Sequence, residues 1–338
     1  MKRLLGIMLA FVLSITVLAG CGGKEDNETT GETVQEQTEN VSTSEAIKVA
    51  ALNGPTAMGM VQMMDSELNP SATNYDFTIA TAIDEVTASI VKGAFDIAAV
   101  PANVASVLYN KTEGGIQVLA INTLGVLYMI EKGEAIQSVE DLRGKTIYTT
   151  GKGATPEYTL NYILEANGLT VGTDVTVEFK SESAECIAIM AEQEDAIAML
   201  PQPFVTSAMI QDESIRIALN MTEEWDKVSE DSSLLTGVVI ARTEFAEANQ
   251  DKVDDFMDQY QTSVDYVISN TEDAAALIEA NDIVAAAVAQ KALPYCNITF
   301  IEGSDMQSKL SGYLNVLYEQ NPESVGGTLP NEDFYYQR

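Results

Sequence analysis

The chain has 338 residues, 46% of them hydrophobic, and a formal net charge of −33 from 51 acidic and 18 basic residues. This charge repels nucleic-acid phosphates and anionic lipid head groups, so we expect no nucleic-acid partner and a surface that stays soluble outside the cell. The sequence holds no histidine and three cysteines, which excludes histidine triads, histidine metal ligands, a disulfide framework and a thiolate zinc site.

The N-terminus has the pattern of an export signal. Basic Lys2 and Arg3 precede an apolar run over 4–18 that is too short to span a bilayer, and small residues follow it up to Cys21. The pattern resembles a bacterial lipoprotein signal, which implies cleavage before Cys21 and an extracytoplasmic protein anchored to the cell membrane by lipid on that cysteine. The alternative is an ordinary signal peptide in which Cys21 has no role. We expect residues 1–20 to be the signal peptide and the polar residues 21–45 to be a disordered tether.

Alternating strands and helices follow from residue 46. Short apolar runs bounded by turn-forming residues predict the strands, and longer runs with helical spacing predict the helices. The break Asn122-Thr123-Leu124-Gly125 is turn-prone, and we interpret it as a crossing between two lobes. The first part of the chain is predicted to hold strands over 47–52, 75–80, 96–100, 117–121 and 126–130, a Met-rich helix after Thr56, and helices over 83–92 and 101–109.

The second part continues in the same order. A turn over 139–144 and a loop over 151–155 flank a strand over 145–150, and the helix after the loop ends at Gly168, which suits a left-handed cap. The strand over 236–241 is predicted to return to the first lobe. Further strands are expected over 175–179, 196–200 and 215–219, and helices over 244–270, 272–281 and 306–319.

Two stretches, 85–101 and 185–201, share one pattern: a helix-like run, an acidic residue and a short apolar run that ends in proline. Each apolar run suits a strand buried on both faces of a parallel sheet, and Pro101 or Pro201 ends it because proline cannot donate to the ladder. Two similar α/β halves indicate a cleft between them. Ligands of open parallel sheets bind at the carboxyl ends of the strands, where the two prolines fall.

The order of motifs resembles a known family. Ser138-Val-Glu-Asp-Leu-Arg-Gly-Lys145, a strand, Gly151-Lys-Gly-Ala-Thr-Pro-Glu157 and a helix ending in Gly-Leu are similar to the second lobe of ABC-transporter substrate-binding proteins of the nitrate/sulfonate/taurine (NitT/TauT) and thiamine-precursor group. Gly93-Ala-Phe-Asp96-Ile-Ala resembles the first lobe of that family, and the segment 195–204 resembles the second. The resemblance covers about 46–246.

The resemblance implies an α/β, two-lobed periplasmic-binding-protein type 2 fold, with two hinge strands and a ligand cleft between the lobes. Lobe I is then 46–127 and 238–338, and lobe II is 128–237. The ligand is handed to an ABC permease and its ATPase. We expect a monomer without a cofactor.

Candidate ligand contacts lie in the loops after the strands. Two helix starts, at 53–56 and 152–155, offer free backbone N–H groups to an acceptor or an anion, and rim amides fix orientation. The alternative is that Thr56 and Thr155 only cap their helices. The predicted rim comprises Asn53, Gly54, Pro55, Thr56, Pro101, Ala102, Asn103, Asn122, Thr123, Lys152, Gly153, Ala154, Thr155, Pro201 and Gln202.

Other residues allow two interpretations. Trp225 and Tyr128 either stack on a flat ligand or belong to the core, and a methionine cluster at 58–64 either lines a soft pocket or, as we prefer, packs in the core. The aspartates on the helix at 251–258 share one face but lack the loop geometry of calcium sites, so no metal site is expected. Cys186 and Cys296 are predicted to be unpaired because they fall in different lobes.

The leading hypothesis is a lipid-anchored solute-binding protein that serves an ABC importer by hinge closure. A sensory protein that presents its closed form to a receptor is an alternative. An enzyme on the same fold is disfavoured, because pyrimidine-forming relatives use a histidine and this chain has none. The predicted rim holds no arginine, which argues against amino-acid ligands. A sulfonate-type oxyanion suits the helix starts and Lys152, whereas a flat heterocycle or vitamin precursor, which we slightly favour, suits the amide-rich rim.

Overall fold

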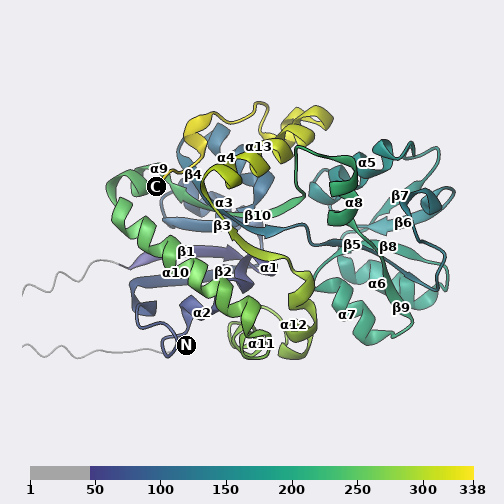
Figure 1. Ribbon diagram of the computed structural model, residues 1–338, viewed down its shortest axis with the longest axis horizontal. Coiled ribbons are helices and arrows are strands. Elements are labelled where there is room, and N and C mark those ends of the chain that lie inside the picture. The colour runs from purple at the N-terminus through teal and green to yellow at the C-terminus, as the bar shows by residue number, and fades with distance from the viewer. Residues whose placement is uncertain (1–45) are drawn as a thin grey trace, which may run out of the picture. The chain divides into compact units, whose positions relative to one another are not determined.

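The computed structural model describes residues 46–338, and Figure 1 shows its two sheets with their helices. The predicted signal peptide, the tether and Cys21 lie outside the described residues. Over 46–338, none of the helices combines the length and the apolar character that a membrane span requires.

Six strands form the first sheet, in the order β11-β4-β10-β3-β1-β2. β1 (Ile47–Leu52), β2 (Tyr75–Ala80) and β3 (Ile97–Pro101) run parallel. β10 (Leu235–Arg242) lies antiparallel between β3 and β4 (Ile116–Leu124), so the strand predicted to return to the first half does so. β11 (Ile298–Ile301) pairs with β4 at the edge.

Five strands form the second sheet, in the order β7-β6-β8-β5-β9. β6 (Thr146–Thr149), β7 (Thr176–Phe179) and β8 (Ile197–Pro201) run parallel. β5 (Leu127–Lys132) runs antiparallel to both β8 and β9 (Ile215–Asn220). β3 and β8, the two proline-ended strands of the repeated pattern, are buried up to their prolines, as the pattern predicts.

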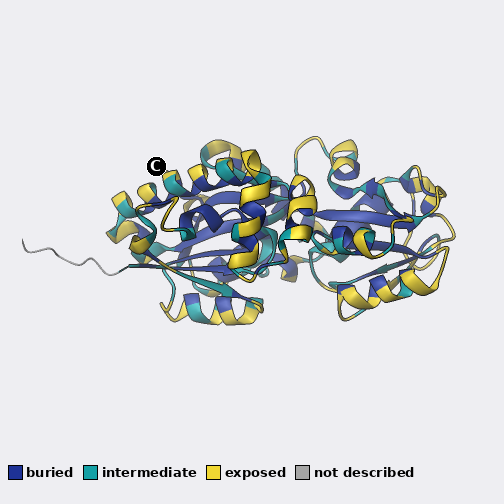
Figure 2. Cartoon of the chain, turned by 90° about the horizontal axis from the view of Figure 1, so that it is seen from below, coloured by how far each residue is buried: buried dark blue, intermediate teal, exposed yellow. Residues whose placement is uncertain are grey.

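Helices follow the strands in both halves, and Figure 2 shows the strands as mostly buried and the outer helix faces as exposed. The second sheet carries α5 (Thr155–Ala166), α6 (Ser183–Glu192), α7 (Phe204–Gln211) and α8 (Met221–Val228). The helices belonging to the first sheet are α1 (Pro55–Met58), α2 (Val61–Met64), α3 (Ile83–Val91), α4 (Ala102–Lys111), α9 (Thr243–Ala248), α10 (Gln250–Ser269), α11 (Thr271–Ala280), α12 (Ala286–Ala292) and α13 (Gly303–Gln320). Short 3-10 turns are η1 (Ala72–Asn74), η2 (Val139–Leu142), η3 (Leu293–Tyr295), η4 (Pro322–Val325) and η5 (Glu332–Phe334).

The structure differs from the predicted elements at several places, three of which bear on the site and the core. The Met-rich helix is two short helices, α1 and α2, whose Met58, Met60 and Met63 are fully buried, which confirms the core interpretation. The predicted helix over 244–270 is interrupted at Asn249, whose Nδ2 donates to the carbonyl oxygen of Phe245 at 3.0 Å and so competes with the helical ladder. The expected break at 122–125 is shorter, because β4 continues through Leu124.

The chain crosses between the sheets at two places, and both crossings leave each sheet at the same end of its strands. The first crossing joins β4 to β5 through Gly125 and Val126, and the second runs from β9 through α8 to β10. Pro101 pairs with Gly237 at the start of β10, and Pro201 pairs with Leu127 at the start of β5. The carboxyl ends of β1–β3 and of β6–β8 therefore face the region in which the chain crosses from one sheet to the other.

An apolar cluster runs through both halves of the molecule. Val238 of β10 and Tyr313 of α13 come from the half that contains the first sheet. Met129 of β5, Tyr158 of α5 and Trp225 of α8 come from the half that contains the second sheet. Two further clusters lie apart from it, one around α10 and one around α6 and α7. The α13–α5–α8 side of the molecule is thus joined by buried contact between the two halves.

Candidate functional site

The start of α1 is built into a buried network. Thr56 Oγ1 donates to the carbonyl oxygen of Leu52 at 2.7 Å, and Asn122 Nδ2 donates to the carbonyl oxygen of Thr56 at 3.1 Å. Thr123 Oγ1 in turn donates to Asn122 Oδ1 at 3.2 Å. A Cβ on Gly237 would lie 2.5 Å from Asn122 Oδ1, so glycine is needed for this close approach. The network positions the helix start against β4 and β10.

Asn53 and Gly54 keep more freedom. The backbone N–H of Asn53 donates to the carbonyl oxygen of Ala80 at 2.8 Å, while its half-buried side chain makes no hydrogen bond to the described residues. Gly54, the N-cap residue of α1, has a φ of 122°, and Pro55 occupies the first helical position. The Asn53 amide is thus available to a ligand at the carboxyl end of β1.

The loop after β3 is tied to the C-terminal part of the chain. Pro101 is the N-cap residue of α4, and Ala102 is buried behind it. Asn103 Nδ2 donates to the carbonyl oxygen of Ser324 in η4 at 3.1 Å. The Asn103 amide therefore already holds a partner within the fold.

The loop 151–155 leads into α5 and is partly satisfied internally. Gly153, with a φ of 74°, donates its N–H to Glu157 Oε2 at 2.5 Å, and Ala154 is the N-cap residue without a side-chain cap. Lys152 Nζ lies 5.9 Å from the centroid of the Phe179 ring. The hydroxyl of Thr155 accepts a hydrogen bond from Tyr313 at 3.3 Å. A carboxylate of the chain itself thus occupies an N–H group that a ligand anion would need.

Gln202 is the most distinctive residue of the predicted rim. It is 2% exposed, and its backbone N–H donates to the carbonyl oxygen of Val126 in the first crossing at 2.9 Å. Its Oε1 accepts from the N–H and the hydroxyl of Thr206 at 3.2 and 2.8 Å. Its buried Nε2 has no hydrogen-bond partner among the described residues. An unpaired buried donor costs about 1–3 kcal/mol, so this amide nitrogen calls for an acceptor.

Trp225 and Tyr128 are core residues. Trp225 is fully buried, and its Nε1 donates to Ser232 Oγ at 2.9 Å. Tyr128 is 3% exposed, and its hydroxyl donates to the carbonyl oxygen of Tyr295 at 2.8 Å. The core interpretation is confirmed for both. Cys186 and Cys296 are free and buried, as predicted.

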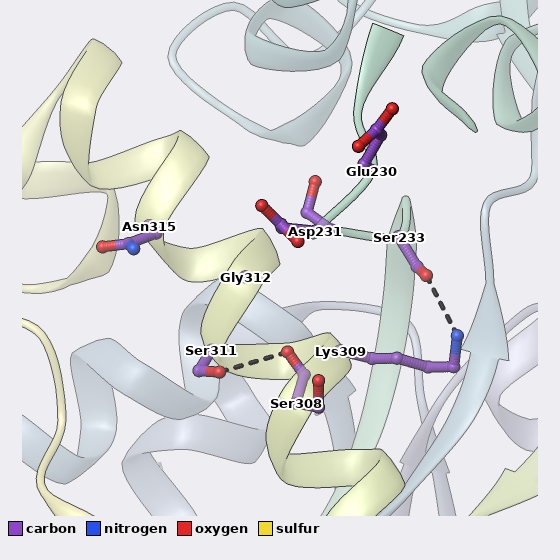
Figure 3. Close-up of a pocket in the computed structure, with 9 residues that line it drawn as sticks. Glu230, Asp231, Ser233, Ser308, Lys309, Ser311, Gly312 and Asn315 are labelled. Atoms are coloured by element: carbon purple, nitrogen blue, oxygen red, sulfur yellow. Dashed lines mark hydrogen bonds between the residues drawn. The ribbon is translucent and has the colours of Figure 1, made fainter. Parts of the chain in front are cut away.

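Pockets lie beside the predicted rim as well as away from it. One of about 260 Å³ is at the carboxyl ends of β6 and β7, lined by Thr150, Ser181, Glu182, Ser183, Ala184 and Phe204. Sequence reasoning missed the residues 181–184, although they stand between a strand and a helix start like the two loops it selected. Another pocket, of about 400 Å³, lies between the segment 230–233 and α13 and contains no predicted rim residue (Figure 3).

The structure has two sheets, each flanked by helices, and the chain crosses twice between them. The carboxyl ends of the parallel strands face these crossings, and this arrangement defines a type 2 periplasmic binding protein fold. Residues 85–274, more than half of the chain, match the family model described as NMT1/THI5 like. The chain belongs to the NMT1/THI5-like family. The family and the fold predicted from the sequence are both confirmed.

Solved structures support the fold. An ABC transporter protein from Parabacteroides distasonis is 22% identical, with a TM-score of 0.74 over 87% of this chain and 100% of that one. The periplasmic aliphatic sulphonate binding protein SsuA from Escherichia coli is 15% identical, with a TM-score of 0.70 over 87% and 93%. A zinc-bound ligand binding component of an ABC-type import system from Staphylococcus aureus is 13% identical, with a TM-score of 0.62 over 87% and 97%. No curated protein sequence matches the chain significantly.

Proposed function

We propose that this protein is an extracytoplasmic solute-binding protein of an ABC importer, anchored to the cell membrane by lipid on Cys21. It binds a small molecule between its two sheets and presents it to a permease and its ATPase. The unpaired Nε2 of Gln202 carries the proposal, because a buried donor at the carboxyl end of β8 is the kind of group that a ligand satisfies. Membership of the NMT1/THI5-like family and the type 2 fold support it.

The ligand is an uncharged, flat molecule with hydrogen-bond acceptors, such as a heterocycle or a vitamin precursor. Gln202 offers a donor, and the Asn53 amide offers both a donor and an acceptor. A sulfonate fits less well, because Glu157 already occupies the Gly153 N–H and Lys152 lies against the Phe179 ring. The E. coli and Xanthomonas relatives in fold are sulfonate-binding proteins, but they share only 15% and 13% identity with this chain.

Closure moves lobe I (46–127 and 238–338) against lobe II (128–237), with bending at 124–130 and 235–240. Hydrogen bonds from the two halves meet at the first crossing. Asn297 Nδ2 and Thr222 Oγ1 both donate to the carbonyl oxygen of Gly125, at 2.6 and 3.2 Å. A ligand that contacts both sheet edges stabilises the closed state and shifts the open–closed equilibrium towards it. The protein acts as a monomer and carries out no catalysis.

A thermal-shift panel tests this function. The probes are taurine, ethanesulfonate, nitrate, cytosine, 4-aminopyrimidine and thiamine. A specific ligand at 100 times its Kd stabilises the folded state by about 2.7 kcal/mol, which raises the Tm by several degrees. We expect a pyrimidine to raise the Tm of the wild-type chain and to lose this effect in Gln202→Ala. A sulfonate that raises the Tm equally in both proteins would overturn the ligand class and the role of Gln202.

A further inference from the structure

The C-terminal helix of one half reaches the candidate ligand loop of the other. Tyr313 of α13 is fully buried, and its hydroxyl donates to Thr155 Oγ1 at the start of α5. Asn321 Nδ2 donates to the hydroxyl of Tyr158 at 3.0 Å, and that hydroxyl donates to the carbonyl oxygen of Gly153 at 3.3 Å. Both ends of the 153–155 segment are therefore bonded, directly or through Tyr158, to α13 and the residue that follows it.

A third hydrogen bond strengthens the same contact. Gln320 Nε2, at the end of α13, donates to the carbonyl oxygen of Tyr158 at 3.1 Å. The three side chains 313, 320 and 321 come from the first half of the molecule, and every acceptor belongs to α5 or its leading loop. These three bonds are thus all directed at the first turn of α5, next to the loop 151–155.

Aromatic packing fixes α13 at this position. The Trp225 ring lies between Tyr162 of α5 and Tyr313, with centroid separations of 4.4 and 5.8 Å. A Cβ on Gly312 would lie 2.3 Å from the carbonyl oxygen of Asp231, so α13 also packs tightly against the second crossing. Figure 3 shows Gly312 and Asp231 on facing sides of the pocket there, where Lys309 Nζ donates to Ser233 Oγ at 3.2 Å. The helix holding Tyr313 is therefore itself well anchored.

The loop needs such support. Gly151 and Gly153 both have left-handed backbone conformations, with φ values of 75° and 74°. Glycine has the largest backbone freedom of all residues, so a loop with two of them loses order readily when outside contacts are removed. A disordered loop binds a ligand more weakly, because binding must then order it.

We propose that Tyr313 and Asn321 are positioning residues that hold the loop 151–155 in its ordered conformation from the opposite half of the molecule. Neither belongs to the predicted rim, and each acts through Thr155 or Tyr158. The inference rests on the proposed function only for the statement that the loop 151–155 contacts a ligand. The order of the loop is measurable without one.

Hydrogen–deuterium exchange of the full chain, without added ligand, tests the inference. In Tyr313→Phe and in Asn321→Ala we expect the amides over 152–158 to exchange at least about fivefold faster, the factor that corresponds to one lost hydrogen bond. Tyr336→Phe is the matched control, because it removes a tyrosine hydroxyl that donates to Asp254 Oδ1 at 2.8 Å, on α10. The control should leave exchange over 152–158 unchanged.

A conservative pair separates positioning from general stability. Thr155→Ser keeps the hydroxyl that accepts from Tyr313 and should exchange like wild type, whereas Thr155→Val should behave like Tyr313→Phe. The double variant Thr155→Val/Tyr313→Phe should exchange only slightly faster over 152–158 than either single variant. The inference is overturned if Tyr313→Phe and Asn321→Ala exchange at the wild-type rate over 152–158. It is also overturned if Thr155→Ser and Thr155→Val exchange at the same rate. Either result leaves the ligand panel, and so the proposed function, to be judged separately.

Discussion

The hydroxyl of Tyr128 in β5 donates to the carbonyl oxygen of Tyr295 in η3 at 2.8 Å, and the two rings meet edge to face at 6.0 Å. This bond joins a strand of the second sheet to a segment that leads into β11 of the first. Burial is the main reason that the pKa of the Tyr128 hydroxyl lies far above its ordinary value. The hydroxyl therefore stays protonated, and able to donate, throughout the physiological range.

Several tyrosines share this behaviour, which predicts alkaline instability. Burial first, then the neighbouring Glu332, raises the pKa of Tyr335 to about 12. Burial and a hydrogen bond to Asp254 raise that of Tyr336 to about 12. Below the unfolded-state pKa of about 10 these phenols are protonated in both states and leave stability independent of pH. Above pH 10 the unfolded chain loses protons first, so we expect the Tm to stay level to about pH 9.5 and then fall. Ultraviolet titration of the native protein with all tyrosines ionising near pH 10 would contradict this account.

Gly312→Ala should destabilise the protein. Its new Cβ would lie 2.3 Å from the carbonyl oxygen of Asp231, and this backbone atom cannot yield as a flexible side chain would. We expect a loss of about 1–3 kcal/mol, measured by urea unfolding. Ser311→Ala is the control, because this exposed residue of the same helix bonds only to the carbonyl oxygen of Ser308. Equal stability of the two variants would show that the segment at 231 yields freely.

Cys21→Ser should release the protein from membranes. Small residues before Cys21 and a polar segment after it form the pattern of a lipid-anchored N-terminus. Serine at position 21 cannot carry the lipid, and none of the helices described over 46–338 could span a membrane. The variant should therefore appear in the soluble fraction after a high-salt wash, whereas the wild type should stay with the membranes. Retention of the variant in the membrane fraction would rule out the anchor.

Gln202→Ala and Asn53→Ala should weaken binding of whichever panel compound stabilises the chain. The Gln202 donor is buried without a partner, and the Asn53 amide makes no internal hydrogen bond among the described residues. Each lost ligand bond should cost about 1 kcal/mol, or about fivefold in Kd, and more at the buried Gln202. Titration calorimetry measures the change. Gln307→Ala, which loses an exposed bond to Glu332 near the start of α13, is the control with unchanged affinity.

Ligand binding should compact the molecule. Gly125 lies in the first crossing, where a Cβ would come 2.2 Å from Thr222 Oγ1, so Gly125→Ala should disturb the crossing and reduce closure. Small-angle scattering with and without the bound compound should show a smaller radius of gyration for the wild type only. An unchanged radius in the wild type at saturating ligand would argue for a rigid site.

The sequence by itself determined the local elements, because their signals are local. Apolar runs ending at Pro101 and Pro201 predicted β3 and β8, and β1 and β2 were predicted with the bounds that they have. Several short elements were not predicted: β11 has four residues, α12 seven, and α7 and α8 eight each. A helix of seven or eight residues shows only about two turns of hydrophobic period. The interruption of the helix at Asn249 was also not predicted, because it depends on one side-chain hydrogen bond.

Tertiary structure decided which rim groups are free. Asn103 and Thr155 looked equivalent to Asn53 and Gln202 as polar residues after strands. Asn103 is bonded to Ser324, 221 residues away, and Thr155 to Tyr313, 158 residues away. Such pairs depend on how the chain crosses between the sheets, and no local pattern encodes them. The single unpaired donor of Gln202 likewise emerges only when Thr206 and Val126 have taken the other polar groups of that residue.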